Sequence, residues 1–400
     1  MENGILHIDM NNFYASVETL YAPELKNVPM AVAGDEKNRH GIILAKNMLA
    51  KQYGVQTAEP IGQALKKCPG LTLVPPHHDR YHYFSRRAKA IYCEYTDRVE
   101  SFGLDECWLD VYGSERLFGD GEKIAYTIKD RIRQELGLTV SVGVSFNKIF
   151  AKLGSDYKKP DAVTVFGREQ MESVIWQLPC DTLLFVGPST RKALDRLGLY
   201  TIGDVARAPL PVLRKALGRM GETLWMYANG KDDSPVRRAD VREEAKSIGN
   251  SVTLPYDITT EDEVRRTLLS LAQTVAGRLR AQGMKAGEVQ LTVKRDNFEE
   301  IQRQMPVTPE VCDSQSIYKA ALELYHREHR GWAIRLLGIR VSRLVDREAA
   351  QLSFFDAADG RERREKLETA VDSLKARFGK NSVSTALNLE GKERKDHGAS

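Results

Sequence analysis

The chain has 400 residues, of which 42% are hydrophobic and 28% are charged, as is typical of a globular protein with about two to four domains. Its net charge of +4 is too small to indicate a polyanionic partner by itself, although basic residues can still gather on one face. The N-terminus lacks the basic segment and apolar run of a signal peptide or membrane anchor, and the five cysteines lack C-x-x-C spacing, which argues against disulfides and structural zinc and for a reducing compartment.

Up to about residue 166, strand patterns alternate with helix patterns. Residues 5–10 (ILHIDM) predict a strand and residues 13–21 a short helix. Aromatic and apolar residues recur at helical spacing over 78–96, which predicts a long amphipathic helix. This order fits a βαββαβ-like sheet with helices on one face. Further strands are expected at 28–34, 41–45 and 139–145, and further helices at 46–54, 60–67 and about 120–136.

The second half has a different texture. Glycines break residues after 166 into short helices, and the polar stretch 229–247 is typical of a linker. Beyond it the patterns again follow the order β-α-β-β-α-β, with helices at 261–282 and 314–328, which predicts a second, separate α+β module. A charged helical tail follows.

One short stretch, SFGLDECWLD at 101–110, places two adjacent carboxylates, Asp105 and Glu106, near the start of a half-buried strand. Adjacent strand residues point to opposite faces, so these two can share a site only at the strand end, where Gly103 permits a turn. Carboxylates this close repel each other unless a proton or a cation lies between them. A strand end with two solvated acids is the alternative.

Asp9 adds a third carboxylate at the end of the strand predicted over 5–10. Three acids at strand ends of one sheet suit hard divalent cations, and two Mg²⁺ ions about 3.5–4 Å apart can clamp the attacking and leaving oxygens of a phosphoryl transfer. The spacing alone leaves equally open that the three acids never meet.

Lysines follow at a predicted strand–helix junction, residues 143–163. Lys148 and Lys152 lie one helical turn apart and so share a face, while Lys158 and Lys159 precede Pro160 in a loop. Lysines beside a metal site can neutralise phosphates. Alone, the same pattern is that of an ordinary solvated helix face.

Three motifs together resemble a known family. HIDMNNFYASVE (7–18), VESFGLDECWLDV (99–111) and GVSFNKIFAKLGSDYKKPD (143–161) are similar, in order and spacing as well as in sequence, to the palm motifs of the Y-family, or translesion, DNA polymerases, the bacterial polymerase IV group being nearest. The resemblance extends to about Phe355. It implies that the metal-binding catalytic carboxylates are Asp9, Asp105 and Glu106, that the carbonyl of Met10 is a further ligand, and that two Mg²⁺ ions are bound, Mn²⁺ being possible.

The resemblance also assigns the nucleotide pocket. Tyr14 matches the steric gate that leaves no room for a ribose 2′-hydroxyl. Ile42 and Leu44 match the roof over the nascent base pair, and their bulk predicts a narrower range of lesions. Nucleotide contacts are expected at Asn12, Phe13, Tyr14, Lys51 and Lys159.

The sequence departs from the family at the predicted helix over 46–54. Met48 and Lys51 stand where the family commonly has a tyrosine and an arginine on the phosphates. Lysine keeps the charge but loses the bidentate fork, and methionine donates no hydrogen bond. We therefore expect weaker nucleotide binding, or help from Lys46 or Asn47.

Two regions are expected to contact DNA. Residues 183–206 resemble a helix-hairpin-helix, in which turn amides at a helix N-terminus hold a phosphate, a simple helical hairpin being the alternative. The second α+β module resembles the family's little finger, and three arginines lie on or beside its last strand, where an ordinary surface strand is the alternative. The candidate contacts are Gly187, Ser189, Thr190, Arg335, Arg340 and Arg343.

A pentapeptide, QLSFF, follows this module. It resembles the peptide by which bacterial polymerases bind the β sliding clamp, a strand packed on its own domain being the alternative. Its residues are Gln351, Leu352, Ser353, Phe354 and Phe355. The tail carries a helical apolar stripe that is expected to cover the clamp peptide, dock on the protein or bind a partner. The stripe consists of Leu367, Val371, Leu374 and Phe378.

The implied fold is a multidomain α+β, right-hand polymerase. It has a ferredoxin-like palm, small fingers, a helical helix-hairpin-helix thumb and a βαββαβ little finger. The expected boundaries are 1–19 and 77–166 for the palm, 20–76 for the fingers, 167–235 for the thumb, 236–244 for a linker, 245–345 for the little finger and 346–400 for the clamp peptide and tail. A monomer on primer/template DNA is expected, using deoxynucleoside triphosphates and the β clamp, without a membrane, in the bacterial cytoplasm and at the nucleoid when active.

Two functions follow from this. The first is low-fidelity, low-processivity translesion DNA synthesis. The second is a catalytically weak DNA-binding accessory protein of the same fold. The three acids favour the enzyme, because a scaffold does not need carboxylates gathered at strand ends.

Overall fold

The computed structural model divides the chain into two compact units, Met1–Arg242 and Glu243–Ser400, each described here by itself. The structure describes residues 3–34, 41–241, 244–328, 331–347, 361–379 and 382–383. Within these ranges no helix is long and apolar enough to cross a membrane.

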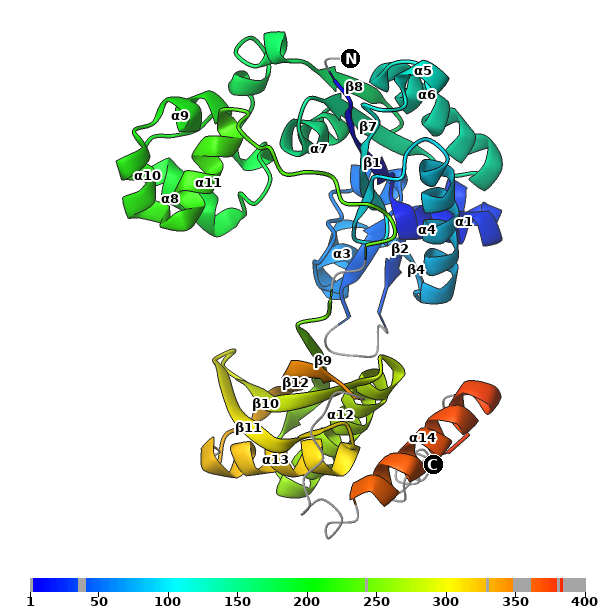
Figure 1. The fold of residues 1–400 in the computed structure, drawn as a ribbon, viewed down its shortest axis with the longest axis vertical. Helices are drawn as coiled ribbons and strands as arrows, with labels where there is room; N and C mark the ends of the chain where they lie inside the picture. The colour runs from blue at the N-terminus through cyan, green and yellow to red at the C-terminus, as the bar shows by residue number, and fades with distance from the viewer. Residues whose placement is uncertain are drawn as a thin grey trace. The chain divides into compact units, whose positions relative to one another are not determined.

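A five-stranded sheet forms the centre of the first unit, with the strand order β5-β6-β1-β7-β8 (Figure 1). The first four strands pair antiparallel and β8 pairs parallel to β7. Every residue of β1 is buried, because the strand is paired on both sides and covered on both faces. The strands are β1 (Ile5–Met10), β5 (Val99–Phe102), β6 (Glu106–Asp110), β7 (Val140–Ser145) and β8 (Val163–Phe166).

Helices cover both faces of this sheet, so the expectation of helices on one face only was wrong. Helices α4 (His78–Cys93) and α6 (Gly121–Arg131) share a hydrophobic core with Leu6, Ile8 and Met10. Helix α7 (Lys148–Tyr157) packs against β1, β7 and β8. A Cβ at Gly143 would collide with the α7 backbone, so the glycine lets α7 lie close to β7. His7 and Asp9 alternate with the core residues and therefore face α7.

A small sheet, β3-β2-β4, is inserted between β1 and α4. Asn47 begins α2 there, because its side chain accepts a hydrogen bond from the Ala50 N–H. The elements of this region are α1 (Phe13–Tyr21), β2 (Met30–Ala33), β3 (Ile43–Lys46), α2 (Met48–Gln52), α3 (Ile61–Lys67) and β4 (Thr72–Val74). Shorter helical segments of the unit lie at Pro23–Asn27, Glu115–Phe118 (α5), Ile132–Leu136, Arg168–Gln170, Ile175–Gln177 and Cys180–Thr182.

Four short helices follow β8 and share a hydrophobic core with α7 and Phe166 at the end of β8. Thr201 and Asp204 form a capping box at the start of α9. The helices are α8 (Pro188–Arg196), α9 (Ile202–Arg207), α10 (Leu210–Leu217) and α11 (Arg219–Ala228), drawn in green in Figure 1.

The beginning of the expected linker is anchored on the first sheet. Val236 is buried beside Ile5 and Trp108. The Arg237 N–H donates to Glu100 Oε2 at 3.0 Å, and its guanidinium reaches Glu100 Oε1 at 3.2 Å. Residues 236–237 are therefore part of the first unit's packing.

The second unit has the predicted β-α-β-β-α-β element order but a different strand order from the first sheet. Its antiparallel sheet runs β11-β10-β12-β9, so its first strand lies at an edge, whereas β1 lies in the middle of the first sheet. Two helices pack side by side on one face (Figure 1). The elements are β9 (Ser247–Ile258), α12 (Glu261–Ala281), β10 (Met284–Arg295), β11 (Glu300–Val311), α13 (Ser314–Glu328) and β12 (Ile334–Asp346).

The tail forms helix α14 (Arg361–Phe378), which docks on this unit through charged residues. Glu368 accepts hydrogen bonds from the backbone N–H and hydroxyl of Ser314 at the start of α13, and it pairs with Arg280 of α12. Arg280 also donates to Asp372 at 2.7 Å. The predicted apolar stripe is not the docking face, because Leu367 and Phe378 are 65% and 62% exposed.

Candidate active site

The residues that carry the three carboxylates lie where β1 ends and β6 begins. Asp9 and Glu106 are direct partners across the two antiparallel strands. Asp105 lies in the tight turn between β5 and β6, which Gly103 enters with φ of 87°. The Met10 N–H donates to the Asp105 carbonyl at 3.1 Å, which fixes the turn against the end of β1. The turn thus resolves the alternation problem that two adjacent strand residues would otherwise present.

Two lysine ammonium groups lie among these acids. Lys152 Nζ is 3.1 Å from Glu106 Oε2 and 3.6 Å from Asp9 Oδ2. Lys159 Nζ is 2.6 Å from Asp9 Oδ2. Asp156, which the sequence reasoning missed, joins them, since it lies 3.1 Å from Lys152 Nζ and 2.6 Å from Lys159 Nζ. Asp156 follows Lys152 by four residues, and this spacing could have predicted their ion pair from the sequence.

His7 supports Glu106 from beneath and was also missed. Its Nε2 is 3.2 Å from Glu106 Oε2, and its Nδ1 is 2.8 Å from Ser155 Oγ on α7. The ring meets Trp108 edge to face at 5.0 Å between centroids. Burial lowers the pKa of His7 to about 4, so the imidazole is neutral near pH 7.

The surroundings of the three acids shift their pKa values in different directions. Burial raises the pKa of Asp9 to about 6, against the opposing charges of Lys159 and Lys152. Burial also raises the pKa of Asp105. At Glu106 burial acts in the same sense, yet the neighbouring His7 and Lys152 lower its pKa to about 2.

The donor set fits a divalent cation. The carboxylates of Asp9, Asp105 and Glu106 carry hard oxygen donors that would suit such an ion, and the Lys152 ammonium shows that positive charge is accommodated between Asp9 and Glu106. Among the described residues, no three acidic, histidine or cysteine side chains already stand in a metal-binding arrangement. The two lysines would therefore move away from the acids as a cation enters.

Lys148 does not join this group, although it shares a helix face with Lys152 in the sequence pattern. Its Nζ lies 2.8 Å from Glu100 Oε2 and 4.9 Å from the centre of the Trp108 ring. The Trp108 indole N–H donates to the Lys148 carbonyl at 2.9 Å. These contacts hold α7 on the sheet rather than completing the carboxylate site.

The expected nucleotide residues at the start of α1 lie beside the acids. Asn12 precedes α1 in the left-handed region, with φ of 48°, and so turns the chain from β1 into the helix. Phe13 is buried in the core and Tyr14 is partly exposed. Burial, and then the charge of Asp105, raises the pKa of Tyr14.

The inserted small sheet places the remaining nucleotide candidates. Lys51 and Met48 are exposed on α2. Ile42, just before β3, is also exposed, while Leu44 is partly buried against the main core. Asn47 is not available for a phosphate, because its side chain caps α2 and also bonds Met30 N, Leu25 O and Val28 O. The suggested help from Asn47 is therefore wrong.

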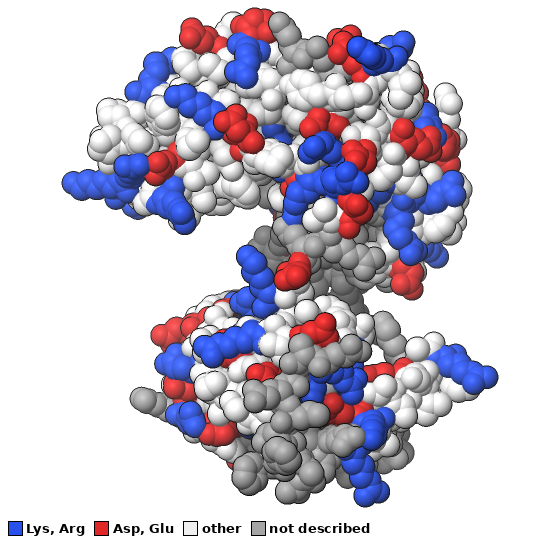
Figure 2. Space-filling model, viewed as in Figure 1, with Lys and Arg blue, Asp and Glu red and all other residues white. Residues whose placement is uncertain are grey.

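The expected DNA contacts occupy two surfaces, one on each unit. Gly187 precedes α8, and Ser189 in its first turn is exposed. Arg340 lies on the face of the second sheet that the helices leave open, beside a polar groove of about 350 Å³. Arg343 lies 3.5 Å from Glu288 Oε2, and Arg335 covers the Phe298 ring at 4.5 Å. In the view of Figure 2, basic and acidic side chains are interspersed on both units.

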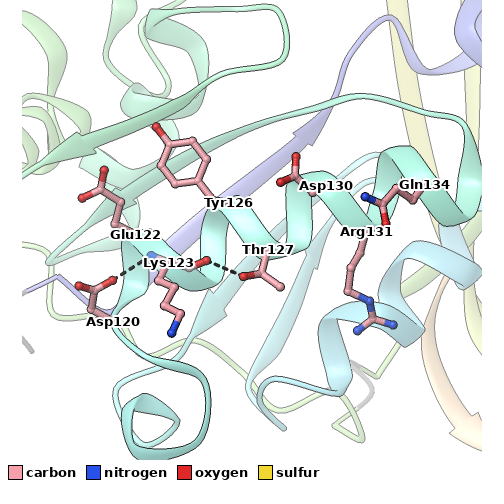
Figure 3. Close-up of a pocket in the computed structure, with 8 residues that line it drawn as sticks. All are labelled: Asp120, Glu122, Lys123, Tyr126, Thr127, Asp130, Arg131 and Gln134. Carbon is pink, nitrogen blue, oxygen red and sulfur yellow. Dashed lines mark hydrogen bonds between the residues drawn. The ribbon is translucent and has the colours of Figure 1, made fainter.

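A larger groove, of about 610 Å³, lies along α6 in the first unit (Figure 3). Its lining residues run from Asp120 along the outer side of α6 to Gln134. Because α6 covers the face of the sheet opposite to α7, this groove is separate from the carboxylates. Residues 351–355, the expected clamp peptide, lie outside the described residues.

Comparisons with known proteins agree with this architecture. Residues 8–156 match the impB/mucB/samB family and residues 245–354 its C-terminal domain. The chain is 47% identical to DNA polymerase IV of Acetivibrio thermocellus, over 98% of both chains. It is 37% identical to DNA polymerase IV of Pelotomaculum thermopropionicum, over 97% of this chain and 96% of the relative.

A solved structure supports the fold. A "Y-family DNA polymerase chimera Dbh-Dpo4(243-245)-Dbh" superposes with a TM-score of 0.75 at 24% identity, covering 86% of this chain and 99% of the chimera. The predicted fold class is therefore confirmed. On the strength of the sequence matches, the chain belongs to the DNA polymerase IV family.

Proposed function

We propose that this chain carries out translesion DNA synthesis, adding deoxynucleotides to a primer 3′-hydroxyl under the direction of a template. Membership of the DNA polymerase IV family makes it a DNA-directed DNA polymerase. The observation that carries the proposed mechanism is the pairing of Asp9 with Glu106 across β1 and β6, with two lysines beside them. Low fidelity and low processivity belong to the same proposal.

The carboxylates of Asp9, Asp105 and Glu106 and the carbonyl of Met10 would hold two Mg²⁺ ions, or Mn²⁺ in their place. Such ions, when bound, activate the 3′-hydroxyl and offset the charge of the departing pyrophosphate. The primer 3′-hydroxyl would lose its proton to solvent as its oxygen bonds to the α-phosphorus of the nucleotide, and the bond from that phosphorus to the departing pyrophosphate would break. His7 Nε2 lies 3.2 Å from Glu106 Oε2, and a proton on that nitrogen would keep this carboxylate oriented.

Lys159 would exchange partners during the reaction. In the structure its ammonium group binds Asp9 and Asp156. A triphosphate carries more negative charge than these carboxylates, and a lysine head on a long stem can follow that charge. Lys51 would contribute a second positive charge from α2, without the fork of an arginine. Tyr14 would exclude the ribose 2′-hydroxyl, and Ile42 and Leu44 would cover the base pair.

DNA would be held mostly through its phosphates. The amides of Ser189 and Thr190, at the first turn of α8, suit a phosphate oxygen. Arg335, Arg340 and Arg343 would add contacts from the second unit, Arg343 from its present place beside Glu288. These contacts carry no sequence information, which suits a polymerase that works on any template.

The wider setting is also proposed. Residues 351–355 would bind the β sliding clamp, and the enzyme would work as a monomer in the bacterial cytoplasm, at the nucleoid when active. The inactive accessory protein is not favoured, because the carboxylates and lysines are brought together in one place.

The test is extension of a primed template by the purified protein with Mg²⁺ and each deoxynucleotide. We expect templated addition by the native chain and its loss in an Asp105→Ala, Glu106→Ala double variant. Glu122→Ala with Asp130→Ala, on the outer side of α6, is the matched control and should leave extension intact. No addition by the native chain despite DNA binding would mean that the accessory function is correct.

A further inference from the structure

Tyr14 rests face to face on a second tyrosine, Tyr81 of α4. The ring centroids are 4.0 Å apart and the planes are 9° from parallel. Phe13 and His78 meet the same two rings at an angle, with centroids 5.6–6.2 Å away. The position of the Tyr14 ring is therefore determined by aromatic packing, and chiefly by Tyr81.

Tyr81 is fixed by hydrogen bonds at its hydroxyl. The side chain is fully buried. Its hydroxyl donates to Glu18 Oε1 at 2.6 Å and accepts from the His77 backbone N–H at 3.1 Å. Burial and then the bond to Glu18 raise the pKa of Tyr81, so it remains a donor. With both ends of the ring constrained, Tyr81 cannot turn away from Tyr14 without breaking a buried hydrogen bond.

Glu18 is a buried carboxylate whose side-chain partners, among the described residues, lie in the first turn of α4 or just before it. Its side chain is 3% exposed. Besides the Tyr81 hydroxyl, Glu18 binds an Arg80 guanidinium nitrogen at 2.8 Å and His77 Nδ1 at 3.0 Å. A buried carboxylate is costly unless several donors satisfy it, and here it joins α1 to α4. Glu18 also follows Tyr14 by one helical turn, so one short segment carries both residues.

We propose that Glu18 is a positioning residue for sugar selection. It holds Tyr81, and Tyr81 by stacking holds the Tyr14 ring against the sugar of the incoming nucleotide. This inference rests on the proposed role of Tyr14 as the steric gate. A gate excludes a single hydroxyl only while its ring is held to a fraction of an ångström, so its support determines selectivity.

The test compares ribonucleotide with deoxynucleotide incorporation opposite one template base. The measured quantity is the ratio of the two kcat/KM values in the same enzyme preparation. Partial unfolding lowers both values equally and leaves the ratio unchanged, whereas a displaced gate changes it. We expect Tyr81→Phe and Glu18→Gln each to raise the relative use of ribonucleotides about 5- to 10-fold, with deoxynucleotide incorporation reduced less than about threefold.

Three comparisons make the outcome decisive. Tyr83→Phe removes an exposed hydroxyl from the same helix and should leave the ratio unchanged. Tyr14→Ala should raise ribonucleotide use most, and adding Tyr81→Phe to it should have no further effect, because Tyr81 acts only through Tyr14. If Tyr14→Ala changes the ratio but Tyr81→Phe and Glu18→Gln do not, the positioning role is refuted. If Tyr14→Ala leaves the ratio unchanged, the gate assignment itself is wrong and the positioning role falls with it.

Discussion

Two of the clusters in which acidic side chains pack against basic ones are built differently, one at the end of β1 and one on α14. At the end of β1, Asp9 and Glu106 share the ammonium group of Lys152, and Asp9 also pairs with Lys159. On the second unit, Glu368 and Asp372 of α14 share the guanidinium of Arg280, which is 6% exposed. Glu368 also accepts from the backbone N–H of Ser314. One set uses lysines alone, and the other uses an arginine fork and a helix end.

This difference in side chains indicates which cluster can exchange its ion-pair partners and which one serves as a structural joint, a fixed contact between helices. A lysine is a point charge on a long stem, and it can leave one carboxylate for another anion at low cost. An arginine fork and a backbone N–H are fixed in direction, so they hold one arrangement. We therefore expect metal and nucleotide to rearrange the first group, while the second keeps α14 in place.

The largest effect should come from neutralising one acid in each place. Asp9→Asn should lower primer extension by about 1,000-fold or more, because it removes an expected metal ligand. Asp372→Asn, the matched change in α14, should alter extension of a short template less than about twofold, because α14 serves to hold the fold. Single-nucleotide incorporation kinetics on both variants provide the measurement. Equal losses in the two would erase the distinction between site and joint.

Removing the exchangeable cation should strengthen metal binding. Lys152 lies where a divalent ion would meet Asp9 and Glu106, so it competes with that ion. Lys152→Met should raise Mn²⁺ affinity in the absence of nucleotide about tenfold, because the acids then lack their own counter-charge. Electron paramagnetic resonance of free Mn²⁺ measures this. Lys148→Met is the control on the same helix, and it should leave affinity unchanged because Lys148 pairs with Glu100.

Acidification should weaken cation binding at the carboxylates of Asp9 and Glu106. The pKa of Asp9 is raised to about 6, so a growing share of Asp9 carries a proton below that pH and cannot bind a cation. Between pH 7 and pH 5.5 we expect Mn²⁺ binding to fall about fourfold. For stability, the folded chain holds this proton more tightly than the unfolded chain. The contribution of Asp9 is therefore present below about pH 4 and lost as the pH rises through about 6. The measurement is Mn²⁺ binding as a function of pH, and an Asp9→Asn variant should show no change in binding near pH 6.

The sequence predicted β1, β7 and the strand that carries Glu106 for clear reasons, but it did not predict β8. The alternation of Leu6, Ile8 and Met10 with polar residues defined β1, and Gly103 marked the turn that precedes Asp105 and Glu106. The roles of His7 and Ser155 could not be predicted, because they meet only when α7 packs across the sheet at Gly143. Strand patterns do not show which helix will cover a given face.

Two other features were hidden for a related reason. Glu18 has the appearance of an ordinary helix glutamate, and only the packing of α4 makes it a buried carboxylate. In α14 the apolar stripe was visible, and docking on the protein was one of three roles expected for it, whereas Glu365 and Glu368 form the docking contacts. Periodicity identifies the faces of a helix and does not identify the partner that each face meets.

The smallest predicted effect concerns the joint itself. Arg280→Met should lower the free energy of unfolding of the second unit by about 1–2 kcal/mol, because Glu368 and Asp372 lose their shared partner but remain partly exposed to water. Urea unfolding of the full chain, with hydrogen exchange of the α14 amides, provides the measurement.

Arg265→Met on the same helix is the control for this prediction. Arg265 forms an exposed i,i+4 pair with Glu261, and its loss should cost only about 0.5 kcal/mol or less. Faster exchange confined to α14 in Arg280→Met would show that the arginine fork holds the tail helix. Unchanged exchange there would mean that Glu365, with Lys285 and Arg347, is sufficient to dock α14. The claim that Arg280 fixes the position of α14 would then be wrong.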